Sequence, residues 1–342
     1  MRFTEEVVQA IKNFILLNVS KYPNKITQIT VDHFQISKPT VLKYLSELVV
    51  EGLIEKKGSN RYPNYRLFTE EIKLTYSNAD LEEDIIWTKD ISKKIKGINP
   101  NVKDICHYGF TEMVNNVIDH SGSKDLKIRI KQNYNEVIMY IYDTGIGIFN
   151  KIKKDLGLSE TKHSILELAK GKFTSDPDNH TGEGIFFTSR IFDNFFIVSH
   201  LLTYIGMGNK DGWIFEDVEG DIPGTVVAMK INKKSTITID RIFNEYADPD
   251  KIPGFHRTVI PVELMQHEGE ALLSRSQAKR LIFRFDKFLE VVLDFKGVKQ
   301  IGQAFADQIF RIFQRENPNV HLEAINTNES IKNMIQHIHN SV

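Results

Sequence analysis

The sequence FTEMVNNVIDHS at residues 110–121 decides how the middle of this chain is interpreted. It reads as a helix, and Glu112 and Asn116 stand four residues apart, so both side chains project from one helical face. A carboxylate can accept a proton from water, and an amide oxygen is a ligand that Mg²⁺ accepts. The stretch therefore predicts a helix that carries an acid–base group beside a metal ligand.

Glycine-rich turns follow this helix. Period-two patterns at residues 126–133 and 137–142 predict two strands, and the second runs into DTGIG at residues 143–147. After a long polar stretch, TGEG at residues 181–184 opens another helix, and Gly224-Thr225 begins an apolar strand. Glycines let backbone N–H groups approach phosphates closely, and a helix N-terminus adds a favourable dipole. These turns are therefore candidate phosphate-binding elements.

Each motif alone is weak, but their order within residues 110–225 resembles the GHKL ATPase fold. This Bergerat-type α/β sandwich is shared by gyrase B, MutL, histidine kinases and anti-sigma-factor serine kinases. With His120-Ser121 at its end, the helix is most similar to that of the anti-sigma kinases, and the likeness covers roughly residues 75–232. No phosphoacceptor-histidine helix precedes the block, which disfavours a sensor histidine kinase.

The resemblance implies roles for the first two motifs. Glu112 would be the general base, and Asn116 would ligate the Mg²⁺ that bridges the phosphates of ATP. Asp143 would accept a hydrogen bond from the exocyclic amine of adenine. Gly145 and Gly147 would make room for the base and begin the lid.

The resemblance also implies roles for the later motifs. Gly182 and Gly184 would contact the phosphates through their backbone, and Thr225 would reach the water network between Asp143 and adenine. Residues 149–181 would form a lid over the nucleotide. Two lid residues are alternative contacts of the γ-phosphate: Lys162 and Lys172.

The N-terminal 68 residues are basic, with ten Lys and Arg against six Asp and Glu, whereas the whole chain has a net charge of −1. Helical patterns at residues 3–18 and 29–34 precede a third helix, which Ser37 caps and Gly52 ends. Two short strands then flank a loop. This order resembles the winged helix-turn-helix of bacterial regulators.

In such a module the recognition helix meets base edges and cations meet phosphates. The resemblance therefore implies contacts with double-stranded DNA at Ser37, Lys38, Thr40, Lys43, Tyr44 and Arg61. A balance of +4 is modest for phosphate binding, so a protein-binding winged helix with solvated lysines stays open.

Strands and helices alternate after residue 235, which predicts an α/β sheet. The expected elements include a strand at 236–239, another at 257–262 and a helix at 276–287. VVLDFKGV at residues 291–298, followed by IGQAFAD at 301–307, resembles STAS domains, and is closer still to an uncharacterised STAS-like family often found behind a GHKL module. No Ser or Thr stands at 301–304, where anti-anti-sigma factors carry their phosphorylated serine. We therefore expect a surface for an unidentified protein partner.

The composition fits a globular α+β and α/β multidomain protein, with 41% hydrophobic and 26% charged residues. The expected domains are a winged helix at 1–68, a GHKL domain at 69–232 and a STAS-like domain at 233–342. The single Cys106 excludes an internal disulfide and a multi-cysteine zinc finger. No apolar run reaches the ~18 residues of a membrane span, and the first residues do not resemble a secretory leader, so a cytoplasmic location is expected.

Three functions remain open on this basis. The first is an ATP-dependent regulator of transcription in which Mg-ATP binding, with slow hydrolysis, controls the DNA-binding and partner-binding modules. The second is a serine/threonine protein kinase of the anti-sigma type that acts on a separate partner. The third is a DNA-binding scaffold with a structural nucleotide. Proteins of the GHKL superfamily often dimerise, so a homodimer is also an open expectation.

Overall fold

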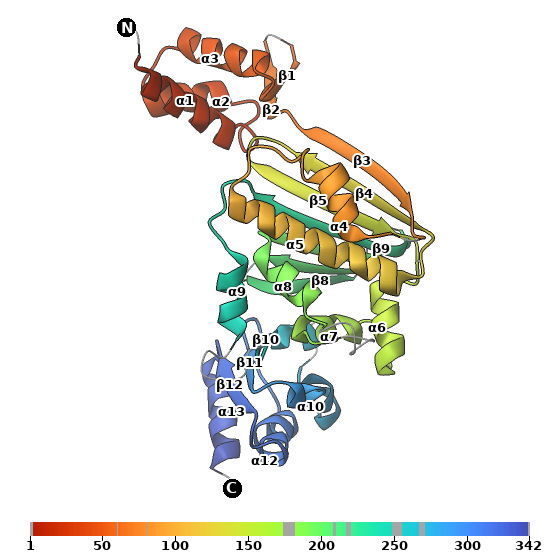
Figure 1. Cartoon of the computed structure of the whole chain (residues 1–342). Coiled ribbons are helices and arrows are strands. Elements are labelled where there is room, and N and C mark those ends of the chain that lie inside the picture. The colour runs from red at the N-terminus through yellow and green to blue at the C-terminus, as the bar shows by residue number, and fades with distance from the viewer. Residues whose placement is uncertain are drawn as a thin grey trace.

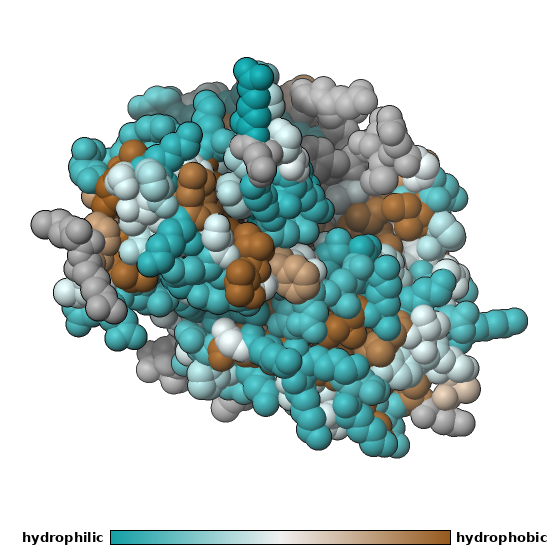
Figure 2. All heavy atoms as spheres, turned by 90° about the horizontal axis from the view of Figure 1, so that it is seen from above, coloured by the Kyte–Doolittle hydropathy of each residue, from teal (hydrophilic) through white to brown (hydrophobic). Residues whose placement is uncertain are grey.

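The structure is a computed structural model that describes residues 3–59, 61–79, 81–173, 182–207, 210–216, 220–247, 255–266 and 271–340. Figure 1 shows three parts in chain order: a helical module, a large sheet with helices, and a smaller α/β part at the C-terminus. Seen from the N-terminal end, the surface is mainly hydrophilic and is interrupted by separate apolar patches (Figure 2). No helix in the described part of the chain is both long and apolar enough to cross a bilayer.

The N-terminal module has three helices and an antiparallel strand pair: α1 (Glu5–Asn18), α2 (Ile26–Phe34), α3 (Lys38–Val50), β1 (Ile54–Gly58) and β2 (Pro63–Leu67). The Ser37 hydroxyl accepts a hydrogen bond from the Thr40 amide at 3.4 Å, so α3 begins where its cap predicts. Lys12 of α1 pairs with Glu47 of α3 at 2.8 Å and with Glu51, which caps the end of α3, at 2.7 Å. The buried side chains of this module form a core of their own.

Seven antiparallel strands form the central sheet in the order β3-β4-β5-β9-β6-β7-β8. Their bounds are β3 (Glu70–Ser77), β4 (Asp125–Gln132), β5 (Glu136–Asp143), β6 (Asn194–His200), β7 (Leu202–Met207), β8 (Lys210–Glu216) and β9 (Ile222–Asn232). Residues of β5 alternate between buried and half-buried, and the buried set includes Val137, Met139 and Ile141. One face of the sheet therefore meets helices.

The helices around this sheet are α4 (Glu83–Ile86), α5 (Pro100–Asn116), α6 (Ile148–Leu156), α7 (His163–Lys170) and α8 (Gly184–Ile191). α5 runs across the sheet (Figure 1), and Gly109 lets it approach closely, because a Cβ there would lie 2.4 Å from the ring of Phe192. The helix expected at 110–121 is thus the second half of a longer one. Its last turn, η2 (Val117–Ser121), is a π-helix rather than an α-helix.

The C-terminal part contains a parallel sheet in the order β10 (Arg257–Pro261), β11 (Glu290–Asp294), β12 (His321–Ile325). Its helical segments are α9 (Ile239–Tyr246), η3 (Val262–Met265), α10 (Arg275–Ile282), η4 (Phe285–Lys287), α11 (Gln303–Asp307), η5 (Gln308–Phe313), α12 (Gln314–Glu316) and α13 (Glu329–His339). The described chain thus has mixed α/β architecture with several sheets.

Two expectations for the C-terminal part are wrong. Residues 236–238 form no strand, because the Thr238 hydroxyl accepts a hydrogen bond from the Arg241 amide at 3.3 Å and thereby starts α9. The helix expected over 276–287 stops at Ile282, and Arg284 follows in the left-handed conformation with φ +65°. The apolar periodicity of this stretch continues past the point where the helix ends.

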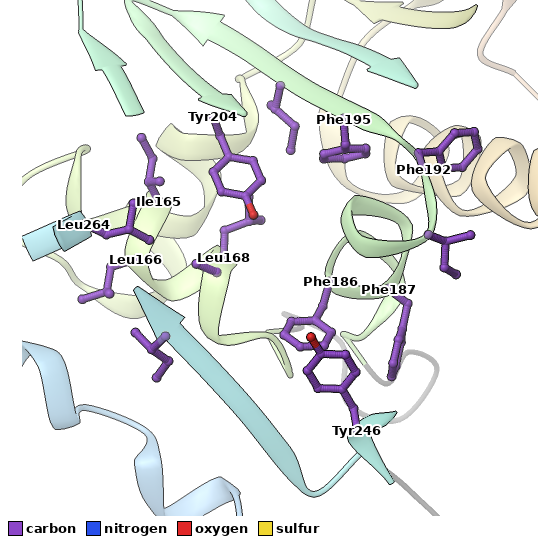
Figure 3. Close-up of a cluster of buried hydrophobic side chains, with 14 of the residues drawn as sticks. Ile165, Leu166, Leu168, Phe186, Phe187, Phe192, Phe195, Tyr204, Tyr246 and Leu264 are labelled. Carbon is purple, nitrogen blue, oxygen red and sulfur yellow. The ribbon is translucent and has the colours of Figure 1, made fainter. Parts of the chain in front are cut away.

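A single hydrophobic core runs through the central and C-terminal parts. Figure 3 shows Phe186 and Phe187 of α8 close to Tyr246 of α9, while Ile165 and Leu166 of α7 lie near Leu264. Phe187 also stacks on Phe243 of α9, with ring centroids 4.0 Å apart. These two parts are therefore packed as one body, whereas the N-terminal module has its own core.

Candidate functional site

A cavity of about 300 Å³ lies between α5 with its π-helical turn, the strands β5 and β9, and the helices α6, α7 and α8. Seven of the eight nucleotide-site residues expected from the sequence line it: Glu112, Asn116, Asp143, Gly147, Gly182, Gly184 and Thr225. Gly145 is the exception. It packs against the end of the π-helical turn, where a Cβ would lie 1.9 Å from the carbonyl oxygen of Ser121. Residues more than 100 positions apart thus meet at one site.

The carboxylate of Glu112 faces the N-terminus of α8. A Cβ on Gly184 would stand 1.9 Å from Glu112 Oε2, so only a glycine leaves this carboxylate in place. Tyr108 precedes Glu112 by one turn, and its pKa is raised by burial and by the charges of Glu112 and Glu183. Glu112 therefore lies beside a helix N-terminus and a neutral phenol.

Asn116 lies one turn after Glu112, on the same side of α5. Its Nδ2 donates to the Glu112 carbonyl at 2.8 Å, so a cation in the cavity would be met by the amide oxygen. The widened π-helical turn that follows brings Asp119, His120 and Ser121 to the cavity wall. Sequence periodicity does not reveal a π-helical turn, which inserts an extra residue into a helix.

Asp143 is the last residue of β5, lines the same cavity and is 6% exposed. Burial raises its pKa above the ordinary value, while hydrogen bonds from Gly145 and Thr225 act to lower it. Its Oδ1 accepts from the Gly145 amide at 2.8 Å. Thr225 is its register partner on β9, and the Thr225 hydroxyl accepts from the Ile148 amide at 3.0 Å. These bonds fix the carboxylate, β9 and the start of α6 relative to one another.

Among the described residues that line the cavity, Lys151 of α6 is the one Lys or Arg side chain. Its Nζ lies 2.6 Å from Asp155 Oδ2. Sequence reasoning missed it, although its position is readable: it follows Gly147, where α6 begins, by one helical turn.

Neither lysine suggested by the sequence lines the cavity. Lys162 pairs with Glu160 at 2.9 Å. Lys172 donates to the Lys287 carbonyl at 3.0 Å and lies over the rings of Phe255 and Phe288, 5.6 and 5.1 Å from their centroids. Lys162 is thus held by a neighbour in its own segment, whereas Lys172 is held by the C-terminal part, which packs against the expected lid. Residues 174–181 of that lid lie outside the described residues.

Five of the six residues proposed for DNA contact are on the surface of the N-terminal module. Ser37, Lys38, Lys43 and Arg61 are exposed, and Thr40 is half-buried. Tyr44 corrects the expectation, because it is 5% exposed and belongs to the module's core. Because its side chain lies on the inner face of α3, Tyr44 is not available for contact with DNA.

Residues 277–332 match the model of a STAS-like domain of unknown function (DUF4325). No curated protein matches the chain. The matched residues run from α10 to α13 and include β11 and β12. The C-terminal part of the chain therefore contains a STAS-like domain.

Proposed function

We propose that the cavity binds Mg-ATP and that the protein is an ATP-dependent regulator. The observation that carries this proposal is the meeting of Glu112, Asn116, Asp143, Gly184 and Thr225 around one cavity. The cavity volume of about 300 Å³ lies at the lower end of the range for small-molecule sites. A carboxylate, an amide oxygen, a buried carboxylate and a helix N-terminus that begins at a glycine are together suited to bind a nucleotide and its metal ion.

The Asp143 end of the cavity suits the base. Because Oδ1 is already bonded to the Gly145 amide, Oδ2 is the atom that we assign to the exocyclic amine of adenine. Ile141 and Ile148 line the same cavity and offer apolar surface to the ring. Recognition of an amine by an acceptor in an apolar wall selects adenine over bases that present a carbonyl there.

The opposite end suits the phosphates. The N-terminus of α8 directs backbone N–H groups and a favourable dipole towards an anion. Asn116 would hold Mg²⁺ through its amide oxygen, and Lys151 would supply the cation for the terminal phosphate. Glu112 would take the proton of the attacking water or hydroxyl group. Bound Mg²⁺ would neutralise charge on the phosphate oxygens during transfer.

The two flanking parts provide the output in this proposal. The N-terminal module would be a winged helix that binds double-stranded DNA through Ser37, Lys38, Thr40, Lys43 and Arg61. The STAS-like domain would bind a protein partner. Its stretch 301–304 contains no Ser or Thr, so the serine that anti-anti-sigma factors offer to a kinase is missing at this position.

Calorimetric titration with Mg-ATP and Mg-ADP, together with phosphate release, tests the proposal. We expect Glu112→Ala to bind nucleotide without turnover and Asp143→Asn to lose binding. Asp104→Asn, an exposed change on α5, should behave like the wild type. Absence of any binding by the wild type at millimolar nucleotide would overturn the proposal. Binding without phosphate release would instead favour transfer to a partner, which labelled phosphate would detect.

A further inference from the structure

A buried cluster of charges joins α7 to the STAS-like domain. The Lys170 ammonium is completely buried and lies 2.5 Å from Glu167 Oε1. It also donates to the carbonyl oxygens of Phe283 and Arg280, at 2.8 and 3.2 Å. From the STAS-like side, Arg284 Nη1 donates to Glu167 Oε2 at 3.1 Å. One carboxylate is therefore shared by a cation from each part.

Arg284 holds more than this carboxylate. Its Nη2 donates to the carbonyl oxygens of Gly171, at 3.2 Å, and of Lys172. Its guanidinium group lies 5.8 Å from the ring centroid of Phe173. The residue itself adopts a left-handed backbone with φ +65°, which non-glycine residues keep only when their surroundings fix it. A single side chain thus contacts the whole turn that leaves α7.

The same turn borders the nucleotide cavity. Leu168, Gly171 and Phe173 line it, and we call these three residues the α7 wall. Gly171 has φ +80°, and a Cβ there would lie 2.7 Å from the ring of Phe255 and 2.8 Å from that of Phe186. The α7 wall is therefore fixed on its outer side by groups that enter from the C-terminal part.

The cluster has no stable half-formed state. A buried charge costs free energy unless it is paired, and removing one partner leaves the other uncompensated. Among the described residues, Glu167 is the carboxylate in contact with both Lys170 and Arg284, and Arg280, which faces His163 at 3.2 Å, brings another cation. Separation of α7 from the STAS-like domain would therefore expose the whole cluster to water at once, as in a two-state element.

We propose that Arg284 is a positioning residue for the nucleotide cavity, through which the STAS-like domain holds the α7 wall and is coupled to the bound nucleotide. The coupling rests on the proposed Mg-ATP binding, whereas the holding of the wall does not. Because coupling between two sites is reciprocal, nucleotide binding must in turn tighten the contact between α7 and the STAS-like domain.

Hydrogen exchange on the full-length protein without nucleotide tests the first half. We expect Arg284→Ala to increase amide exchange across residues 163–173. Arg284→Lys keeps a charge near Glu167 but cannot also reach both carbonyl groups, so it should be intermediate. Lys287→Ala removes an exposed cation three residues away and should match the wild type. Unchanged exchange at 163–173 in both Arg284 variants would overturn the holding of the wall.

Titration with Mg-ADP tests the coupling. We expect the wild type to gain protection at residues 275–294 as well as at 163–173, and Arg284→Lys to lose the gain at 275–294 and to bind about tenfold more weakly. The coupling would be refuted if Arg284→Lys bound Mg-ADP as tightly as the wild type and if Mg-ADP protected only the central part of the wild type. The proposed nucleotide site would be unaffected by that result. If the wild type bound no Mg-ADP, both the proposed function and the coupling would be refuted. The exchange comparison without nucleotide would still show whether Arg284 holds the α7 wall.

Discussion

The substitution Glu167→Gln replaces a buried carboxylate by a neutral amide of the same shape. The Glu167 side chain is 3% exposed and touches Lys170 at 2.5 Å and Arg284 at 3.1 Å. The variant leaves two buried cations without this anion. Removing one partner of a buried ion pair costs about 3–5 kcal/mol. At about 2–4 °C per kcal/mol for a unit of this size, Tm should fall by roughly 6–20 °C.

Lys170→Met is the matched comparison. It keeps Glu167 paired with Arg284, so no net charge is stranded, but it leaves the carbonyl oxygens of Arg280 and Phe283 without their ammonium donor. An unsatisfied buried group costs about 1–3 kcal/mol. We therefore expect Lys170→Met to be destabilised less than Glu167→Gln, although it removes the more deeply buried side chain.

The difference in stability between wild type and Glu167→Gln should depend on pH, because Lys170 titrates in this range. Burial lowers the pKa of Lys170 from 10.5 to about 8, against the charge of Glu167, which raises it. Between those values the unfolded chain binds more protons, so this group makes stability rise with pH. Without Glu167 the pKa falls further, and the folded variant releases the proton below pH 8. The stability gap between wild type and Glu167→Gln should therefore be larger at pH 6.5 than at pH 9.

Thermal denaturation followed by circular dichroism at these two pH values is the measurement. The double variant Glu167→Gln/Lys170→Met completes the cycle, and in the Lys170→Met background the effect of Glu167→Gln should lose its pH dependence. A Tm for Glu167→Gln equal to that of the wild type, or a gap that widens towards pH 9, would refute the reasoning.

Gly184→Ala should displace the Glu112 carboxylate, because the added Cβ would lie 1.9 Å from Glu112 Oε2. We expect phosphate release to fall about 100-fold and Mg-ADP binding to weaken less, as steady-state kinetics and calorimetry would measure. Tyr44→Ala should destabilise the N-terminal module by about 3–5 kcal/mol because it empties a core position, whereas Lys43→Ala should leave its melting within about 0.5 kcal/mol and weaken DNA binding. Burial raises the pKa of Cys106 to about 12, so iodoacetamide should modify it only after denaturation, as mass spectrometry would show.

Local patterns were sufficient to predict several elements. Ser37 starts α3 as its cap indicated, and Glu112 and Asn116 share a helical face that lines the cavity. Both predictions depend on residues within four positions of each other, where helical geometry alone fixes the relation. The strand expected at 236–239 is wrong, because the Thr238 hydroxyl group caps a helix there.

The remaining features depend on contacts that sequence periodicity does not encode. Lys172 suggested a phosphate ligand because it falls in the expected lid, yet two phenylalanine rings of the C-terminal part hold it away from the cavity. The sequence pattern places Lys151 in a polar lid, whereas the structure shows it on α6, a helix that brings it to the cavity wall. Tyr44 lies next to an exposed lysine on α3, and only the packing of the module distinguishes the two.

The ion pair between Glu167 and Arg284 can form only after the ribosome has added Arg284. Arg284 follows Glu167 by 117 residues, and a ribosome that adds 5–20 residues per second needs about 6–23 s to reach it. During this interval the nascent α7 lacks its guanidinium partner, and its apolar side chains Ile165 and Leu166 lack the neighbouring Leu264 for most of it. A nascent chain that stops before residue 284 would therefore present an unfinished, aggregation-prone surface to chaperones and proteases.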